Sequence, residues 1–289
     1  MENTSQERWQ TWYEEFDEHH SPDARSQWYS SAANAYRWAR PTYPDSLIDS
    51  AIEAAGLRAD VSSILEIGCG PGIATASLAE RGLRVQAIEP SAAACELARK
   101  SCQAHEKVNV YNSTFEDYPL NSQTFDAVVA ATSFHWVSPA VACSKSAAAL
   151  KPGGALILLW ATPPQPSSKL CQQLQPVYDC FGLSTLGEEQ QRTQAYYQQN
   201  FETFAHTVAD SGYFDLTKVA LEAHTSTYSI DKYLALLSTL SPYIALAENV
   251  STHLFKGLEK VLVDQLQQAP SNSMKMTHWF AAQVAPLKD

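Results

Sequence analysis

The sequence contains no long hydrophobic run and no targeting segment of the usual kind. No apolar stretch approaches the ~18 residues that a membrane-spanning helix needs, and residues 1–7 are polar and acidic. A secretory signal would instead begin with positive charge and continue into an apolar stretch. We therefore predict no membrane span and expect a cytoplasmic protein.

Positive charge is scarce. The chain has 20 Lys and Arg against 31 Asp and Glu, which gives a formal net charge of −11. Sequence-independent binding to nucleic acids depends mainly on Lys and Arg contacts to phosphates, so we predict no nucleic-acid partner. A small anionic substrate is compatible with this balance, because a few local cations can outweigh the field of the whole protein.

The pairs of cysteines and histidines that hold metals are missing. The sequence has no Cys-x-x-Cys and no His-x-x-x-His spacing, so we predict no zinc site and no other metal. In a chain of this size, scattered cysteines indicate reduced, buried thiols. They are Cys69, Cys95, Cys102, Cys143, Cys171 and Cys180.

The middle of the chain alternates between strand-like and helix-like patterns. With 289 residues, of which 45% are apolar, the chain is long enough for a large core. Strands are predicted at about 62–67, 84–89, 107–112, 125–131 and 154–160, with helices at about 73–81, 91–103 and 139–150. This alternation predicts a parallel sheet with right-handed crossovers. Ligands of such sheets bind beyond the carboxyl ends of the strands.

The flanking segments are mostly helical in pattern. Trp9, Trp12, Tyr13 and Phe16 recur every three or four residues, so they share one helical face, which either packs on the main domain or forms a lid. We divide the chain into an N-terminal helical lid at 1–45, a ligand-binding core at 46–162, a helical cap insertion at 163–212 and the rest of the core at 213–289. The last part contains two further strands, at 218–227 and 274–284.

A glycine-rich turn follows the first predicted strand. Gly68, Gly70 and Gly72 have the spacing G-x-G-x-G, which lets the backbone approach a ligand closely. A dinucleotide fingerprint, G-x-G-x-x-G, would place its third glycine at Ile73. Glu89 ends the second predicted strand and could accept hydrogen bonds from both hydroxyls of an adenosine ribose. The turn therefore favours an adenosine-containing ligand.

The motif Glu66-Ile67-Gly68-Cys69-Gly70-Pro71-Gly72 resembles the first motif of class I S-adenosylmethionine (SAM)-dependent methyltransferases. Segments 114–116, 124–129, 133–137 and 150–154 agree with this class in order and spacing. The segments Arg40-Pro41-Thr42-Tyr43-Pro44 and Thr239-Leu240-Ser241 are similar to the trans-aconitate methyltransferase-like (methyltransferase type 11) branch. The resemblance implies an α/β protein with a Rossmann-like, seven-stranded, mostly parallel sheet, flanking helices, N-terminal helices and an inserted helical cap.

The resemblance also implies which residues bind SAM. Glu89 matches the ribose position, and Glu66 matches an acid near the methionine amino group. Thr114 stands where many relatives have Asp at the adenine edge. Arg40 resembles an arginine that pairs with the cofactor carboxylate, a task suited to its planar fork. The full predicted set is Tyr36, Arg40, Glu66, Gly68, Gly70, Glu89, Pro90, Thr114, Phe115, Glu116, Ala131 and Thr132.

His135 and Trp136 are the predicted catalytic residues, since they follow the fourth predicted strand. His135 could remove a proton from an acceptor hydroxyl, could only bind a carboxylate acceptor, or could be structural. Trp136 could present an aromatic face to the sulfonium.

We interpret the chain as a SAM-dependent methyltransferase that acts on a small molecule, with a carboxylate oxygen as the leading acceptor. The alternatives are a NAD-linked oxidoreductase on a similar sheet and a SAM-binding regulatory protein without turnover. We expect a monomer or a homodimer.

Overall fold

The computed structural model describes residues 5–19, 32–266 and 273–288. Its centre is a seven-stranded sheet with the strand order β3-β2-β1-β4-β5-β7-β6. The strands are β1 Ser63–Ile67, β2 Arg84–Glu89, β3 Val108–Asn112, β4 Phe125–Ala131, β5 Leu150–Ala161, β6 Ala220–Tyr228 and β7 Met274–Pro286. Strands β1 to β5 pair in parallel, and β7 pairs antiparallel with both β5 and β6. The predicted mostly parallel α/β sheet is confirmed.

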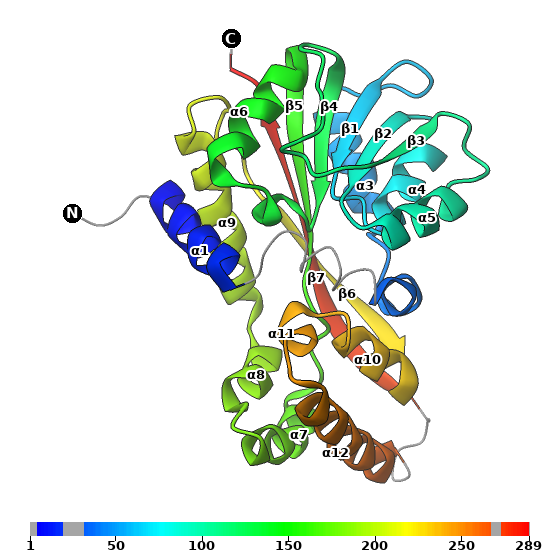
Figure 1. Ribbon diagram of the computed structural model, residues 1–289, viewed down its shortest axis with the longest axis vertical. Coiled ribbons are helices and arrows are strands. Elements are labelled where there is room, and N and C mark those ends of the chain that lie inside the picture. The colour runs from blue at the N-terminus through cyan, green and yellow to red at the C-terminus, as the bar shows by residue number, and fades with distance from the viewer. Residues whose placement is uncertain (1–4, 20–31, 267–272, 289) are drawn as a thin grey trace.

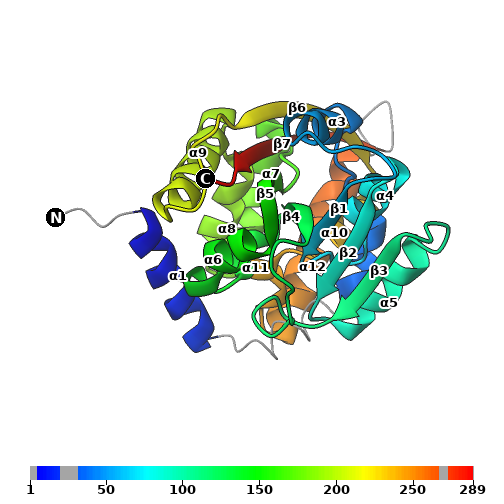
Figure 2. The same cartoon turned by 90° about the horizontal axis from the view of Figure 1, so that it is seen from above.

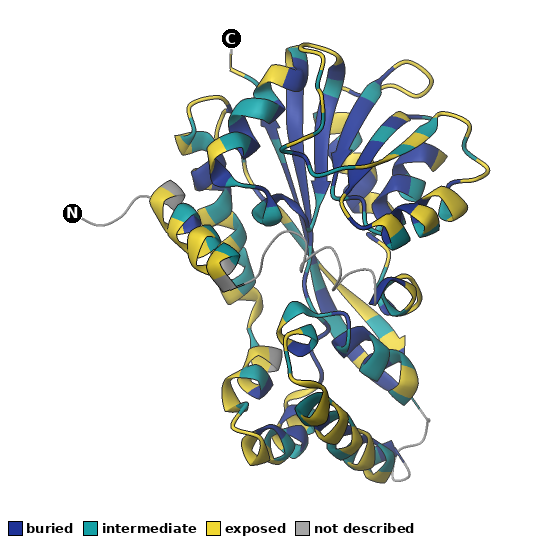
Figure 3. Ribbon diagram, in the orientation of Figure 1, coloured by how far each residue is buried: buried dark blue, intermediate teal, exposed yellow. Residues whose placement is uncertain are grey.

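The central strands are buried on both faces, as Figure 3 shows. Side chains along a strand alternate between the two faces. In β1, for example, Ile64 packs with the apolar cluster on one face and Leu65 with the cluster on the other. Val129 and Val128 of β4 divide in the same way. Such two-sided burial explains why these strands are continuous apolar runs without polar alternation.

Helices cover both faces of the sheet. One face is covered by α3 Asp45–Ala54, α4 Ile73–Glu80 and α5 Ala92–Ser101. The other is covered by α6 Pro139–Ala149, α9 Gln194–Asp210 and α1 Ser5–His19. The view in Figure 2 separates these two groups on either side of the strands. Residues 32–39 are also helical and lead into α3.

A second group of helices lies below the carboxyl edge of the sheet (Figure 1). We call it the helical lobe; it consists of α7 Ser168–Cys180, α8 Ser184–Glu188, α10 Ile230–Leu237, α11 Ser241–Ile244 and α12 Glu248–Leu266. Its core contains Tyr178, Tyr233 and Leu258, together with Tyr228 and Met276 from the extended ends of β6 and β7. The long strands β6 and β7 thus belong to both the sheet and the lobe.

The helices of the predicted cap, 163–212, lie in two places. α7 belongs to the lobe, because Leu174 and Tyr178 pack against α12. α9 instead packs beside the sheet, because Ala205 and Val208 join the sheet's own apolar cluster. α8 and the short helix η2 Glu189–Gln191 connect them. The other helices of the lobe come from 213–289, the part that we expected to complete the core.

The described part of the predicted lid, 1–45, lies against the sheet domain. α1 contacts α9 and α6, and buried Trp9 packs on Phe134 and Phe204. The side chain of Phe16 and residues 20–31 lie outside the described part of the chain.

Candidate cofactor and acceptor site

Gly68 and Gly70, in the glycine turn between β1 and α4, have different roles. Gly68 and Gly70 both have positive φ, +64° and +54°, a region that glycine enters at little cost. A Cβ on Gly68 would lie 2.7 Å from Cβ of Ser133, so this glycine is required for packing against the segment after β4. A Cβ on Gly70 would meet nothing within 4 Å, so this glycine keeps a cavity open.

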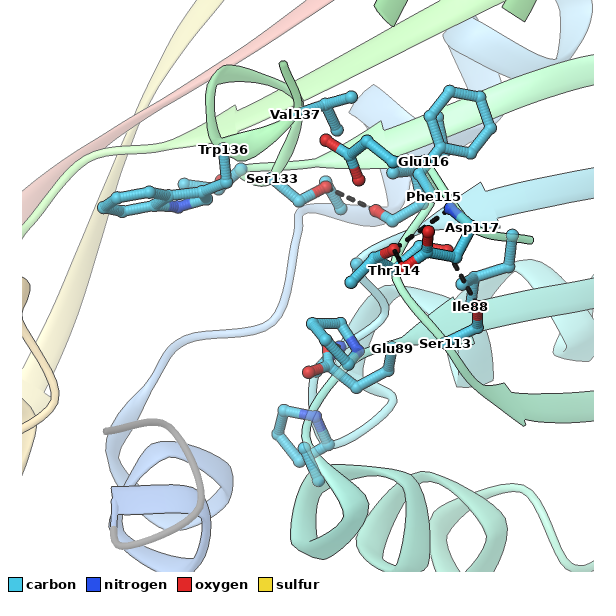
Figure 4. A pocket seen from close by; sticks show the side chains of 18 of the residues that line it. Ile88, Glu89, Ser113, Thr114, Phe115, Glu116, Asp117, Ser133, Trp136 and Val137 are labelled. Carbon is cyan, nitrogen blue, oxygen red and sulfur yellow. Dashed lines mark hydrogen bonds between the residues drawn. The ribbon is translucent and has the colours of Figure 1, made fainter. Parts of the chain in front are cut away.

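That cavity, which we call the main cavity, has a volume of about 300 Å³ and lies at the carboxyl ends of β1, β2 and β4. Most of the predicted site residues line it: Tyr36, Gly68, Gly70, Glu89, Pro90, Thr114, Phe115, Glu116, Ala131, Thr132 and Trp136. Figure 4 shows the part of the wall that carries Glu89, Thr114 and Trp136. Arg40, Glu66 and His135 do not line it.

Glu89 is fixed at the wall by the backbone around it. Its Oε2 accepts from Gly70 N at 3.0 Å, and its Oε1 accepts from Ser91 N at 2.8 Å. Burial raises the pKa of Glu89, and these two N–H groups offset part of the rise. A carboxylate has about four lone-pair sites, so each oxygen can accept a further hydrogen bond from a ligand.

Glu66 is a fully buried carboxyl group behind the glycine turn. Among the described residues no hydrogen bond of good geometry reaches its oxygens, although the nearby hydroxyl of Thr75 partly offsets the effect of burial on its pKa. Desolvation raises the pKa of Glu66 to about 7, and the charge of Glu89 contributes in the same direction. A buried carboxyl group with so weak a partner is costly, although Glu66 does not itself line the main cavity.

Thr114 and Asp117 form a small polar unit on the main cavity wall (Figure 4). Thr114 Oγ1 donates to Asp117 Oδ2 at 2.8 Å and accepts from Asp117 N at 3.1 Å. Glu116, between them, turns its carboxylate to Ser138 N at 2.8 Å, at the start of α6. We did not predict Asp117; the Thr-x-x-Asp spacing is the sequence signal that could have indicated it.

Thr132 adopts a backbone conformation that is rare for a β-branched residue, with φ of +55°. Its Oγ1 accepts from Ala161 N at 3.0 Å and is 2.7 Å from the hydroxyl oxygen of Tyr43. Thr132 and Tyr36 line the main cavity and two smaller ones. Tyr43 was missed as a functional candidate, although it belongs to the segment Arg40–Pro44.

The smaller of these two, the minor cavity, has a volume of about 40 Å³ and adjoins Gly68 and Gly70. Arg40 lines it. The guanidinium of Arg40 donates from Nε to Thr239 Oγ1 at 2.9 Å and from Nη2 to Thr239 O at 3.1 Å, and it lies 4.7 Å from the ring centre of Tyr36. The two segments on which the branch resemblance rests, 40–44 and 239–241, therefore meet in space.

The other, the second cavity, has a volume of about 240 Å³ and lies between the sheet and the helical lobe. His135 lines it, and its ring is 4.7, 5.7 and 6.2 Å from those of Trp136, Trp160 and Trp12. Its buried Nδ1 has no partner among the described residues. Burial lowers the pKa of His135 to about 4, so the imidazole is neutral near pH 7.

Comparisons with known proteins indicate a family for the central part of the chain. Residues 65–158 match the methyltransferase domain family. These residues are similar to methyltransferase domains. An uncharacterized methyltransferase of Mycobacterium tuberculosis is 38% identical over 134 residues, which are 46% of this chain and 52% of that protein. A putative methyltransferase of Dictyostelium discoideum is 30% identical over 130 residues, 45% of this chain and 47% of that protein. The chain thus spans about half the length of the curated relatives it matches.

Solved structures share the fold of this chain. A putative type II methyltransferase from Anaeromyxobacter dehalogenans has a TM-score of 0.56 at 18% identity and covers 86% of this chain and 97% of its own. A putative methyltransferase from an antibiotic biosynthesis pathway of Anabaena variabilis has a TM-score of 0.50 at 16% identity, over 81% and 96% of the two chains. The class I methyltransferase resemblance is confirmed, and the comparisons do not extend to the trans-aconitate branch.

The residues present fit SAM, the cofactor of this methyltransferase class. A Cβ at Gly70 would meet no atom within 4 Å, and Gly70 lines both the main and the minor cavity, so a side chain there would fill space that the glycine turn leaves open. Glu89 has lone pairs left for hydroxyl groups, and the carboxyl group of Glu66 is buried behind the turn. In the described ranges no group of three or more His, Cys, Asp or Glu could hold a metal ion, and no helix there is long and apolar enough to cross a membrane.

Proposed function

We propose that the protein transfers a methyl group from SAM to a small-molecule acceptor. The observation that carries this proposal is a pair of adjoining cavities. The main cavity and the second cavity share Tyr36, Thr132 and Trp136 on their walls, so ligands in the two cavities would meet there. Holding two reactants in contact supplies much of the rate acceleration in such a displacement. SAM supplies the activated methyl group on its sulfonium.

We assign the cofactor-binding roles by position in the site. Glu89 would accept the ribose hydroxyls, and the Thr114–Phe115 backbone with the Thr114 hydroxyl would contact the adenine edge. The methionine part would lie by the glycine turn, with Glu66 near its amino group and Arg40 near its carboxylate. Arg40 lines the minor cavity beside Gly68 and Gly70, which supports this assignment.

A carboxylate oxygen is our proposed acceptor atom. A hydroxyl acceptor needs a base, and a base is most effective when its pKa lies near the working pH. The pKa of His135, about 4, makes this histidine a weak base at neutral pH. A carboxylate needs no base, so His135 and Trp136 would then only bind the acceptor and exclude water.

We also propose a cytoplasmic location. All six cysteines are free thiols, and five of them are buried. Free thiols persist in reducing compartments.

Two measurements test the proposed function. Calorimetry should show S-adenosylhomocysteine (SAH) binding at 1:1 stoichiometry and no NAD binding. An SAH-release assay should then detect methyl transfer within a panel of small acids, phenols and amines. NAD binding without SAH binding would favour an oxidoreductase instead. SAH binding without transfer to any acceptor from the panel or from a metabolite extract would favour a regulatory protein.

A further inference from the structure

The second cavity carries very little charge. Among the described residues that line it, only Arg40 and Glu189 are charged, one of each sign. Arg40 is already engaged with Thr239, and it also faces the minor cavity, where we assign the carboxylate of the cofactor. At most one positive charge is therefore available to an acceptor, and it is shared with another anion.

The helical lobe contributes a group of leucine side chains to this cavity. They are Leu186 of α8, Leu237 of α10 and Leu240, and the same side of the wall also carries Glu189 and Ser241. Arg40, Thr132 and His135 come from the segment before α3 and from the residues after β4, and of these three only Thr132 also lines the main cavity. A molecule in the cavity thus meets the leucine side chains of the lobe and a few separate polar groups.

Glu189 gives the lobe end of the cavity a negative charge. It is an exposed residue at the start of η2. A second carboxylate of an acceptor would reach this end without a cation to pair with, and it would also be repelled by Glu189. Like charges that face each other across a binding interface disfavour such a partner.

The imidazole of His135 adds no compensating charge, since it is packed among three tryptophan rings and its Nδ1 is buried. Aromatic faces, from Tyr36, Trp136 and Tyr243, complete the wall. Apolar and aromatic walls with a few convergent polar groups are typical of sites for amphipathic small molecules.

We infer that the acceptor is a small amphipathic molecule with a single carboxyl group and an apolar body that packs on the leucine side chains of the helical lobe. The charges of the second cavity disfavour dicarboxylic and tricarboxylic acids. This inference rests on the proposed function, because it concerns the acceptor side of the same site.

The test measures ligand binding to the intact protein saturated with SAH. The probes are 3-phenylpropanoate, 4-ethylphenol and propane-1,2,3-tricarboxylate. Calorimetry measures the affinity of each. 3-Phenylpropanoate should bind at least about tenfold more tightly than the tricarboxylate, and more tightly than 4-ethylphenol. Equal or tighter binding of the tricarboxylate, tighter binding of the phenol, or no binding of 3-phenylpropanoate overturns the inference.

A charge reversal provides a second arm. Glu189→Lys places a cation at the lobe end and should raise the affinity for the tricarboxylate by about tenfold. Glu188→Lys is the matched control, because Glu188 is also exposed but does not line the cavity. Equal responses of the two variants would show that Glu189 does not set the charge preference. If wild-type protein fails to bind SAH at all, the proposed function fails first, which separates the two outcomes.

Discussion

Glu89 is the residue on which the cofactor assignment depends most. It is held by Gly70 N and Ser91 N, so its carboxylate is oriented before any ligand arrives. We predict that Glu89→Ala lowers SAH affinity by at least about tenfold, since hydrogen bonds to a charged group contribute about 1.5–3 kcal/mol each. Calorimetry on the folded variant measures this. Glu96→Ala, an exposed glutamate on α5, should leave the affinity unchanged.

Thr132 combines backbone strain with two hydrogen bonds that glycine could not make. Its hydroxyl serves Ala161 N and Tyr43. Thr132→Val keeps the side-chain shape but leaves Ala161 N without this partner, so we expect a loss of about 1–3 kcal/mol in the free energy of unfolding. Thr132→Ser should lose less.

Urea denaturation of these variants, with Thr203→Val as an exposed-hydroxyl control, measures the effect. The loss from Thr132→Val should also shrink in a Tyr43→Phe background, because the two hydroxyls contact each other. Fully additive losses would mean that the Tyr43–Thr132 contact contributes nothing.

Individual contacts of this site differ in how far sequence could reveal them. The glycine turn and Glu89 lie within a short stretch, so their spacing alone suggested a ligand. Tyr43 and Thr132 are 89 positions apart, and Arg40 and Thr239 are 199 apart. Contacts across such distances leave no local periodicity, because they depend on how elements pack. The segments Arg40–Pro44 and Thr239–Ser241 were each recognised in the sequence by resemblance. That they contact each other is seen only in the fold.

In the β1–α4 turn, one glycine is needed for packing and another leaves space for a ligand. Gly68→Ala would place a Cβ 2.7 Å from Ser133, so we expect it to lower the melting temperature strongly. Gly70→Ala meets no neighbour and adds its methyl group to the main cavity, so it should weaken SAH binding more than it weakens folding. Alanine would be strained to a similar degree at both positions, because their φ values are +64° and +54°.

Thermal melts and SAH calorimetry on both variants compare these effects. The alternative outcome, equal stability losses with full SAH affinity for Gly70→Ala, would mean that the turn is not the cofactor cradle.

The sheet could be predicted because its strands are buried on both faces and follow one another in regular alternation. Most of the helices around the sheet were recognised in the sequence, but their positions relative to the sheet could not be predicted. α7 and α9 are both amphipathic, and amphipathicity tells only that one face is buried. Leu174 of α7 packs against α12, whereas Ala205 of α9 packs against the sheet. This difference depends on the long extensions of β6 and β7, which form part of the core of the lobe.

Across the whole molecule, buried ionisable groups make stability depend on pH. The pKa of Glu66 is raised from 4.5 to about 7, so the folded state holds more protons than the unfolded state between these values. Stability from this group therefore falls as pH rises through that window. His135 and His278, both with pKa lowered to about 4, act oppositely and lose stability as pH falls from about 6.5.

We predict that Glu66→Gln is more stable than the wild type at pH 8 and similar to it at pH 4. The difference could reach about 3 kcal/mol, since one pKa unit corresponds to about 1.4 kcal/mol. Urea denaturation of the SAH-free protein across this pH range measures it. Glu53→Gln, an exposed substitution on α3, should follow the wild-type profile. A parallel profile for Glu66→Gln would show that Glu66 is not the titrating group.

The N-terminal helices contact residues of the candidate site. In α1, Trp9 Nε1 donates to His135 O at 3.4 Å, Trp12 contacts Trp136, and Tyr13 lines the main cavity. Tyr36, in the helical segment 32–39, lines all three cavities. We propose that these segments close over bound cofactor and exclude water.

SAH should therefore slow hydrogen exchange across residues 5–19 and 32–40. Arg40→Ala should weaken SAH binding and reduce this protection together, because Arg40 connects the segment to Thr239 and to the proposed position of the cofactor carboxylate. Arg37→Ala, an exposed arginine one turn earlier, should change neither property. Exchange at equal rates with and without SAH would mean that these helices only pack on the sheet domain. Protection that persists in Arg40→Ala at saturating SAH would instead show that closure depends on the aromatic contacts of α1 rather than on the guanidinium.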